Sequence, residues 1–332
     1  MTKLTLTAAL GDYDHTRDLA SGRVDAEGID LRVLNFNVEQ IFYRFHKYRE
    51  WDVSEYSMGL YVSGASQPDH RCIAIPIFPS RVFRHSAIYI RDGGTVSRPE
   101  DLYGKRIGCP QWSQTAAVYV RGYLAETVGL PLSSIRWVQA GVNQPGRPEP
   151  ATLKLPDDID LSFLPTETLD DLLLKGEIDA IISARPPKSF GTGTGVIRRL
   201  FPDYRGAEED YFRQTSIFPI MHTVAIRRDV YESNRWIARN LFIAFEAAKR
   251  RCVERLSDIT ASHAPVPWGS LALETNGAAT AFADSDYWPY GVEPNRKTLE
   301  AFLRFSHDQG ICHRPLDLDE LFAPEALFST QI

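Results

Sequence analysis

The chain has few cysteines, no excess of positive charge and no long apolar run. Its four cysteines are far apart and form no Cys-x-x-Cys pair or Cys/His cluster, so neither a zinc module nor a disulfide framework is indicated. The net charge of -6 argues against nucleic acid as the main partner. No stretch approaches the roughly 20 apolar residues of a membrane span, and the N-terminus lacks a signal-peptide core. We therefore expect a soluble, cytoplasmic protein with reduced, buried thiols.

A length of 332 residues suits two domains rather than one core. A hydrophobic content of 43% and a charged content of 24% are typical of a folded globular protein. Strand and helix signals alternate along the chain, which indicates an α/β fold. Strands are expected up to residue 9 and at residues 29–34, 51–58 with an outgoing loop, 72–78, 87–90, 106–109, 176–182 and 217–226.

Helices are expected between these strands, and the last hundred residues are mainly helical. Asn37 is expected to cap one helix, and Ser113 is the expected N-cap of another. Residues 141–160 are rich in Pro, Gly and charge and predict an irregular excursion. The helices lie at about residues 38–45, 114–128, 166–175, 236–256 and 297–306, with a short turn at 99–105 and an aromatic loop at 286–291.

Two guanidiniums and an imidazole lie between two apolar strands in the run from Pro79 to Ser86. Arginine suits bidentate recognition of carboxylates, and histidine exchanges a proton near neutral pH. Arg81, Arg84 and His85 therefore suggest an anionic substrate that requires a proton. The alternative is that the arginines are surface charges and that His85 is a satisfied strand residue.

Further anion-binding candidates stand at element ends. Arg185 follows the strand at 176–182, at the carboxyl end where ligands bind in open α/β sheets. The helix that begins near Ser113 offers free backbone N–H groups for an anion, although a plain helix start explains the same residues. His222 stands alone in a buried run, where a histidine is more often part of the core than a catalyst.

Several segments, taken in order, resemble the 4,5-dihydroxyphthalate decarboxylase family. That resemblance spans nearly the whole chain and implies the two-lobed architecture of type II periplasmic solute-binding proteins, with a ligand cleft between the lobes and a helical C-terminal segment. The segments that carry it are Gly11-Asp12-Tyr13-Asp14, Phe78-Pro79-Ser80-Arg81-Val82-Phe83-Arg84-His85-Ser86, Pro99 to Gly108, Gly176-Glu177-Ile178-Asp179-Ala180, Ala184-Arg185-Pro186-Pro187, Phe218 to Thr223 and Trp288-Pro289-Tyr290-Gly291.

In that architecture the chain crosses between the lobes twice. We assign residues 1–91 and 215–332 to one lobe and residues 92–214 to the other. Loops at the strand ends would meet at the cleft and bring the candidate site residues together. These residues are Tyr13, Asp12, Glu55, Arg81, Arg84, His85, Ser86, Trp112, Ser113, Arg185 and His222.

The resemblance implies decarboxylation of 4,5-dihydroxyphthalate to 3,4-dihydroxybenzoate. Such a reaction needs a dianion to be held and a ring carbon to be protonated, and it needs no redox cofactor. His85 is our first choice for the general acid, with His222 as the rival. Glu55 or Asp12 would accept a proton from a ring hydroxyl. The carboxylates would be bound by Arg81, Arg84, Arg185, Ser113 and Ser86, and Tyr13 and Trp112 would pack on the ring.

Other functions stay open at this point. A divalent metal held by His85, His222 and Glu55 would suit catechol oxygens, but no close-spaced ligand pair supports one, and we expect no cofactor. The same fold without a catalytic group would be a solute-binding or sensor protein for an aromatic carboxylate. A decarboxylase for a related hydroxylated aromatic acid is a further alternative. The partner in each case is a small molecule, and the C-terminal helices are compatible with a homo-oligomer.

Overall fold

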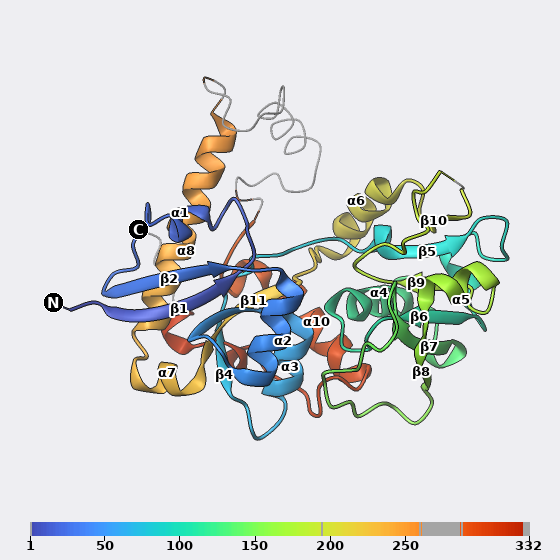
Figure 1. The fold of residues 1–332 in the computed structure, drawn as a ribbon, viewed down its shortest axis with the longest axis horizontal. Coiled ribbons are helices and arrows are strands. Elements are labelled where there is room, and N and C mark those ends of the chain that lie inside the picture. The colour runs from blue at the N-terminus through green and yellow to red at the C-terminus, as the bar shows by residue number, and fades with distance from the viewer. Residues whose placement is uncertain (1, 194, 259, 261–285, 287, 328–332) are drawn as a thin grey trace.

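The protein consists of two lobes that lie side by side along its longest axis (Figure 1). The computed structural model describes residues 2–193, 195–258, 260, 286 and 288–327. Each lobe is built on its own mixed sheet with helices around it. The α/β fold class predicted from the alternation of elements is therefore confirmed.

The sheet of the first lobe has the strand order β2-β1-β3-β11-β4. Strand β1 runs parallel to β2 and β3, whereas β11 is antiparallel to β3 and β4. Strand β11 comes from late in the chain and inserts between two early strands, so it brings distant residues beside β3. The strands are β1 (Leu4–Leu10), β2 (Ile29–Asn35), β3 (Val53–Ser57), β4 (Cys72–Ile75) and β11 (His222–Arg227).

In the first lobe, one helix begins at the capping residue that the sequence predicted, and another helix was not predicted. The side chain of Asn37 accepts a hydrogen bond from the Glu39 N–H and caps α2, as expected. Helix α3 replaces the predicted loop after β3. Because its residues are almost all apolar or glycine, they carry no amphipathic period that would reveal a helix. The helices are α1 (Arg17–Ala20), α2 (Val38–Tyr48), α3 (Met58–Ala65), α7 (Arg228–Ser233) and α8 (Ile237–Ser257).

The sheet of the second lobe has the strand order β10-β5-β9-β6-β7-β8. Strand β5 is antiparallel to both neighbours, and β9, β6, β7 and β8 run parallel to one another. The strands are β5 (Ile88–Arg91), β6 (Arg106–Cys109), β7 (Arg136–Gly141), β8 (Asp160–Thr168), β9 (Ala180–Ile182) and β10 (Ile197–Arg199). The helical elements are η2 (Pro99–Leu102), α4 (Thr115–Glu126), η3 (Leu132–Ser134), α5 (Leu169–Lys175) and α6 (Tyr204–Thr215).

Strand β8 was not predicted, and it displaces the start of the following helix. The sequence indicated a helix from residue 166, but α5 begins after Thr168, whose side chain accepts a hydrogen bond from the Asp171 N–H. Pro165 lies within β8 and hides the strand signal. A proline is tolerated there because β8 is the edge of its sheet, where a missing N–H costs no pairing on the open side.

The first crossing between lobes comes earlier than the predicted boundary at residue 91. Strand β5 belongs to the second sheet, so the chain has crossed before Ile88. The crossing contains the short helix η1 (His85–Ala87). The return crossing leads from α6 to β11. An isolated antiparallel bridge between Arg81 and Ile220 joins the two crossings, which makes them one hinge.

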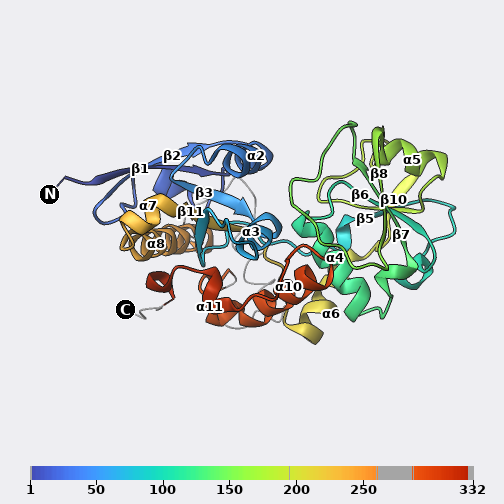
Figure 2. The ribbon, with the colours of Figure 1, turned by 90° about the horizontal axis from the view of Figure 1, so that it is seen from below.

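The C-terminal segment spans both lobes rather than completing only the first. Helix α10 (Arg296–Asp308) packs against α3 of the first lobe and α4 of the second, and Figure 2 shows it beneath both. The remaining elements are η4 (Glu293–Asn295), α11 (Leu318–Leu321) and η5 (Pro324–Ala326). Of the aromatic loop at 286–291, Tyr287 lies outside the described residues. Among the helices described, none has the length and apolar character to cross a membrane.

Candidate functional site

Glu55 and His222 form a hydrogen-bonded pair on neighbouring strands of the first lobe. On β3, Glu55 and Ser57 are two residues apart and therefore face the same side of the sheet, and His222 lies opposite Ser57 on β11. The His222 Nδ1 atom is 2.6 Å from Glu55 Oε1. The Glu55 side chain is fully buried, while 15% of the His222 side chain stays exposed. The sequence predicted both residues for the site, and the structure brings them together.

The Glu55 carboxylate accepts two further hydrogen bonds. The Tyr13 hydroxyl donates to Oε1 at 2.7 Å, and the Gly11 N–H donates to Oε2 at 2.7 Å. Burial alone would raise the pKa of Glu55, but the bonds from His222, Tyr13 and Gly11 outweigh it and hold this pKa below its usual value. Burial and the neighbouring carboxylate raise the pKa of Tyr13. The group is therefore an ionised carboxylate held beside an imidazole.

Glycine is required at position 11 for this arrangement. A Cβ atom there would lie 2.7 Å from the Tyr13 ring and 3.1 Å from Glu55 Oε2. Such contacts would push the tyrosine away from the carboxylate. The predicted role of Tyr13 was to pack on a substrate ring, whereas its observed contact is the hydroxyl bond to Glu55. Asp12, the other residue predicted in this turn, is exposed.

The pair lies where the two lobes touch. Ser57, beside His222, is 3.1 Å from the Thr115 hydroxyl at the start of α4, and the Gly59 N–H donates to the same hydroxyl at 3.0 Å. Phe42 of α2 places its ring edge-on to His222, with centroids 4.7 Å apart. His222 therefore has a carboxylate on one side, an aromatic wall on another, and the second lobe close by.

His15 adjoins this group and was missed in the sequence. Its ring stacks on Tyr13 with centroids 5.2 Å apart and lies 5.7 Å from the Trp288 ring. Burial lowers the pKa of His15, so the ring is neutral at pH 7. Its Nε2 atom is buried and has no hydrogen-bond partner. The available signal was its place one residue after the run from Gly11 to Asp14.

On the second lobe, Ser113 binds a carboxylate of the chain itself. The Glu149 carboxylate accepts hydrogen bonds from the Ser113 hydroxyl and, at 3.2 Å, from the Ser113 N–H. Ser113 is not the helix cap that was predicted: Gln114 is the N-cap of α4 and makes no capping hydrogen bond with its side chain. The sequence predicted that an anion binds at this helix start. In the structure that anion is the carboxylate of Glu149, which belongs to the excursion at residues 141–160.

Arg185 also binds a carboxylate, and this contact crosses between the lobes. Its Nε atom donates to Glu39 Oε1 at 3.0 Å, and Arg147 reaches the same oxygen at 3.5 Å. Glu39 lies on α2 of the first lobe. Arg185 stands close to the α4 start, because the Ala184 N–H donates to Gln114 Oε1 at 3.4 Å. The two carboxylate-binding positions of the second lobe are therefore neighbours.

Arg81 and Ser86 connect parts of the hinge. The Arg81 guanidinium donates to the carbonyl oxygens of Phe218 at 3.0 Å and Pro289 at 3.3 Å, and stacks over the Phe218 ring. Ser86 receives a hydrogen bond from Arg199 on its carbonyl and donates its N–H to Glu208 at 3.4 Å. These contacts tie the two crossings and the aromatic loop together. The partners of Arg81 are carbonyls, where the sequence suggested substrate carboxylates.

Arg84 and His85 line a small cavity of the hinge that contains none of Tyr13, Glu55 or His222. His85 is 5% exposed and lies among aromatic rings. The structure therefore does not bring His85 to the Glu55–His222 pair. Trp112 is fully buried in the core, where its indole N–H donates to the Gln309 carbonyl at 2.7 Å and its ring packs on Trp137.

The chain is similar in sequence to proteins of known name. A protein from Comamonas testosteroni named 4,5-dihydroxyphthalate decarboxylase is 37% identical over 333 residues, which cover 100% of both chains. A protein of the same name from Pseudomonas putida is 40% identical over 217 residues, covering 65% of this chain and 84% of that one. This chain belongs to the 4,5-dihydroxyphthalate decarboxylase family. No family model matches the sequence.

Solved structures show the fold that this decarboxylase-family chain adopts. The periplasmic aliphatic sulphonate binding protein SsuA from Escherichia coli superposes with a TM-score of 0.54 at 13% identity, covering 96% of this chain and 97% of that one. A ligand-binding component of an ABC-type import system from Staphylococcus aureus gives a TM-score of 0.52 at 11% identity, with 98% of each chain covered. The predicted periplasmic-binding-protein-like architecture is confirmed.

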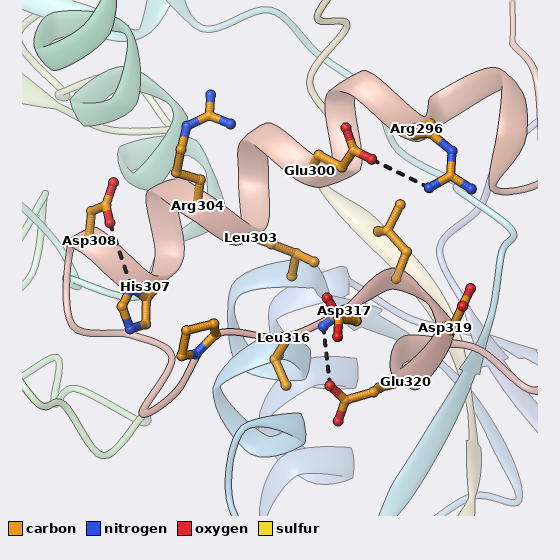
Figure 3. A pocket seen from close by; sticks show the side chains of 12 residues that line it. Arg296, Glu300, Leu303, Arg304, His307, Asp308, Leu316, Asp317, Asp319 and Glu320 are labelled. Carbon is orange, nitrogen blue, oxygen red and sulfur yellow. Dashed lines mark hydrogen bonds and ion pairs between the residues drawn. The ribbon is translucent and has the colours of Figure 1, made fainter.

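A pocket of about 550 Å³ opens beside α10 and α11, and none of the predicted site residues lines it (Figure 3). Most of its charged side chains are paired, as in Arg296 with Glu300 and Arg314 with Glu320. Within the described part of the chain, no group of three or more His, Cys, Asp or Glu side chains is arranged to hold a metal ion.

Proposed function

We propose that this protein removes one carboxyl group from 4,5-dihydroxyphthalate, giving 3,4-dihydroxybenzoate and carbon dioxide. The observation that carries the proposal is the Glu55–His222 pair at the lobe junction, in a chain that matches a protein named for this activity over its full length. The pair supplies a positioned imidazole, which is the group that the chemistry needs most.

The chemistry of this substrate sets the demand on the site. Each carboxyl group is para to a hydroxyl, so the hydroxyl oxygen can supply electrons while the carboxyl-bearing carbon accepts a proton. The bond to the carboxyl carbon then breaks, its electron pair returns to the ring, and carbon dioxide leaves. One proton is consumed, no electrons are exchanged with a cofactor, and aromaticity is restored.

We assign the proton transfer to His222. Its Nδ1–H donates to Glu55, which leaves the Nε2 atom to reach the substrate. The Glu55 carboxylate, 2.6 Å from Nδ1, fixes the plane of the ring and aims Nε2 at the substrate. Tyr13 and Gly11 hold Glu55 in its ionised state, so Glu55 acts on the substrate through His222. We therefore choose His222 as the general acid, although His85 was our first choice from the sequence.

We assign the substrate carboxylates to Arg185 and to the start of α4 at Ser113. Both positions already bind carboxylates of the chain, Glu39 and Glu149, which supports their suitability for anions. A dianion entering the junction would exchange with these side chains. His15 is our choice for the acceptor of a hydroxyl proton, because its neutral ring has a free Nε2 atom whereas Glu55 already accepts three hydrogen bonds.

The test is to incubate metal-stripped protein with 4,5-dihydroxyphthalate and to follow carbon dioxide and ring products, with and without added divalent metal. We expect turnover in both samples, because the chemistry needs a proton donor and no electron sink. Turnover only with metal would make the histidines candidate ligands. Tight binding without product would favour a solute-binding protein, and the absence of both would refute the proposed substrate.

Two predictions from the sequence accompany this proposal. A cytoplasmic location stays a prediction, which cell fractionation with an antibody to the protein tests directly. A homo-oligomer stays a prediction as well, and light scattering of the purified protein gives the mass that decides it.

A further inference from the structure

The charged end of Arg84 has an unusual environment. Its one hydrogen bond in the described structure runs from Nε to the thioether sulfur of Met221, at 3.1 Å. No described carboxylate lies within ion-pair distance, and the Glu208 carboxylate nearby accepts the Ser86 N–H instead. Burial lowers the pKa of Arg84 to about 10, which still leaves the group charged at pH 7. Arg84 is half-buried, so a guanidinium without a carboxylate partner there would be stabilised by an anion that lies beside it.

Neither ring nitrogen of His85, the next residue, has a hydrogen-bond partner among the described residues. Both Nδ1 and Nε2 are buried without a hydrogen-bond partner. The ring is enclosed by Tyr123 of α4, Tyr211 of α6 and Phe201, with centroid separations of 4.5, 5.2 and 5.4 Å. A neutral imidazole carries one N–H donor, and a buried donor without a partner indicates an occupant that accepts it.

Both side chains line the same cavity. It has a volume of about 10 Å³, and Ile88, Tyr119, Val120, Tyr123, Tyr211 and Pro219 complete its wall. A cavity of this size admits one water-sized occupant. A water molecule would satisfy the imidazole but would leave the guanidinium charge unpaired. An aromatic carboxylate is far too large for this space.

We infer that this hinge cavity binds a small inorganic anion such as chloride, held by the Arg84 guanidinium and the His85 N–H. The rest of the wall is aromatic or aliphatic, so Arg84 and His85 supply the charge and the donor that a small anion needs. The other titratable groups that line the cavity are Tyr119, Tyr123 and Tyr211, and the Glu208 carboxylate lies near Arg84. This inference does not depend on the proposed decarboxylation.

The position of the site gives the anion a structural consequence. Arg84 and His85 belong to the first crossing between the lobes, while Pro219 and Met221 belong to the second. An anion in the cavity therefore joins the two crossings at a point close to the Arg81–Ile220 bridge. Loss of the anion should loosen the hinge without altering either sheet.

Thermal unfolding at constant ionic strength tests this inference. Sodium chloride or bromide is exchanged for sodium gluconate, whose anion is too large for the cavity. We expect the melting temperature of the natural protein to rise saturably with halide, by about 2–4 °C. Arg84→Gln should abolish the rise, whereas Arg304→Gln, which removes a surface partner of Glu126, should keep it.

A second measurement covers the case in which Arg84→Gln does not fold. Crystals of the natural protein soaked in bromide should show an anomalous peak between Arg84 and His85. The inference is overturned if halide and gluconate give the same melting temperature, if bromide does not enter the cavity, or if the folded variant responds like the natural protein. It is also overturned if Arg84→Gln instead removes stabilisation by benzene-1,2-dicarboxylate, which would assign Arg84 to the substrate.

Discussion

The imidazole of His222 and the carboxylate of Glu55 lie 2.6 Å apart, although 167 residues separate them in the sequence. Their contact depends on β11, the strand that returns from the second lobe and inserts beside β3. Because Glu55 also accepts bonds from Tyr13 and the Gly11 backbone, two distant segments of the chain, the turn after β1 and the start of β11, fix one carboxylate. Proton transfer by His222 should therefore be sensitive to changes at Glu55.

Glu55→Gln should preserve the shape of the site and remove its charge. A neutral amide accepts the Nδ1–H of His222 less strongly than a carboxylate and holds the ring less firmly, so we expect turnover to fall by about 100-fold while substrate binding persists. Steady-state kinetics, with binding of benzene-1,2-dicarboxylate measured separately, checks this. Glu126→Gln on α4, whose partner is Arg304, is the matched control. Turnover within threefold of the natural protein would remove Glu55 from the mechanism.

The two histidine candidates for the general acid make opposite predictions. His222→Asn should lower turnover by about 100-fold or more, because the proton donor is lost. His85→Asn should leave turnover of the folded protein within a few-fold, because His85 lies in the hinge cavity. Single-turnover measurements at saturating substrate compare them directly. The reverse ranking would restore His85 as the acid and reject His222.

The sequence identified residues better than it identified their partners. Glu55, His222 and Tyr13 were all predicted, because the two-lobed architecture implied by the family resemblance brings their segments to the cleft. Their mutual hydrogen bonds were not predictable, because the register of β11 against β3 is decided by tertiary packing. Arg81 shows the opposite failure: a guanidinium between apolar strands suggested a ligand, but main-chain carbonyls from two distant loops satisfy it.

The second lobe shows how a local pattern can be correct and still mislead. The start of α4 does bind an anion, as its free N–H groups suggested. The anion is Glu149, from an excursion whose path no local pattern revealed. In the same way, Arg185 does bind a carboxylate, but that carboxylate belongs to Glu39 across the lobe junction. The sequence shows which side chains can donate hydrogen bonds to a carboxylate. Whether that carboxylate belongs to the chain or to a substrate depends on the conformation of the loops.

Arg185→Gln should weaken binding of benzene-1,2-dicarboxylate by about tenfold or more. A hydrogen bond to a charged group contributes about 1.5–3 kcal/mol, and this variant loses that bond to the ligand. Isothermal titration of the non-reacting dicarboxylate measures the change without turnover. Arg198→Gln is a suitable control, because Arg198 lies on the edge strand β10 and its guanidinium pairs with Asp92. Equal affinity in the two variants would place Arg185 outside the binding site.

Acid should destabilise the protein through His85. Burial lowers the pKa of His85 from 6.5 to about 4, so the unfolded chain takes up this proton at a higher pH than the folded protein. The free energy of unfolding should therefore fall as the pH drops from about 6.5 to about 4, by about 3 kcal/mol from this residue.

Urea unfolding at several pH values, in halide-free buffer, measures this loss. His85→Phe should reduce the slope between pH 6.5 and 4. Burial also lowers the pKa of His70 to about 4, so part of the slope should remain in that variant. An unchanged slope would show that His85 is protonated in the folded protein.

Two glycines in α3 provide the sharpest test of the lobe contact beside the site. A Cβ atom on Gly59 would lie 2.2 Å from the Ser113 carbonyl oxygen, whereas one on Gly64 would meet only His70 Nδ1 at 3.5 Å. Gly59→Ala must therefore push α3 away from the start of α4 and break the bond between the Gly59 N–H and Thr115. We expect it to cost about 1–3 kcal/mol of stability and to lower turnover.

Gly64→Ala in the same helix should instead be neutral or stabilising by about 0.5–1 kcal/mol, because alanine favours a helix and nothing obstructs it. Denaturant unfolding and turnover of the two variants, measured together, separate helix propensity from lobe contact. If Gly59→Ala matched Gly64→Ala in both, the approach of α3 to α4 would not matter for the protein. If it lost activity while keeping its stability, the close approach would serve the alignment of Ser57 and His222 rather than the fold.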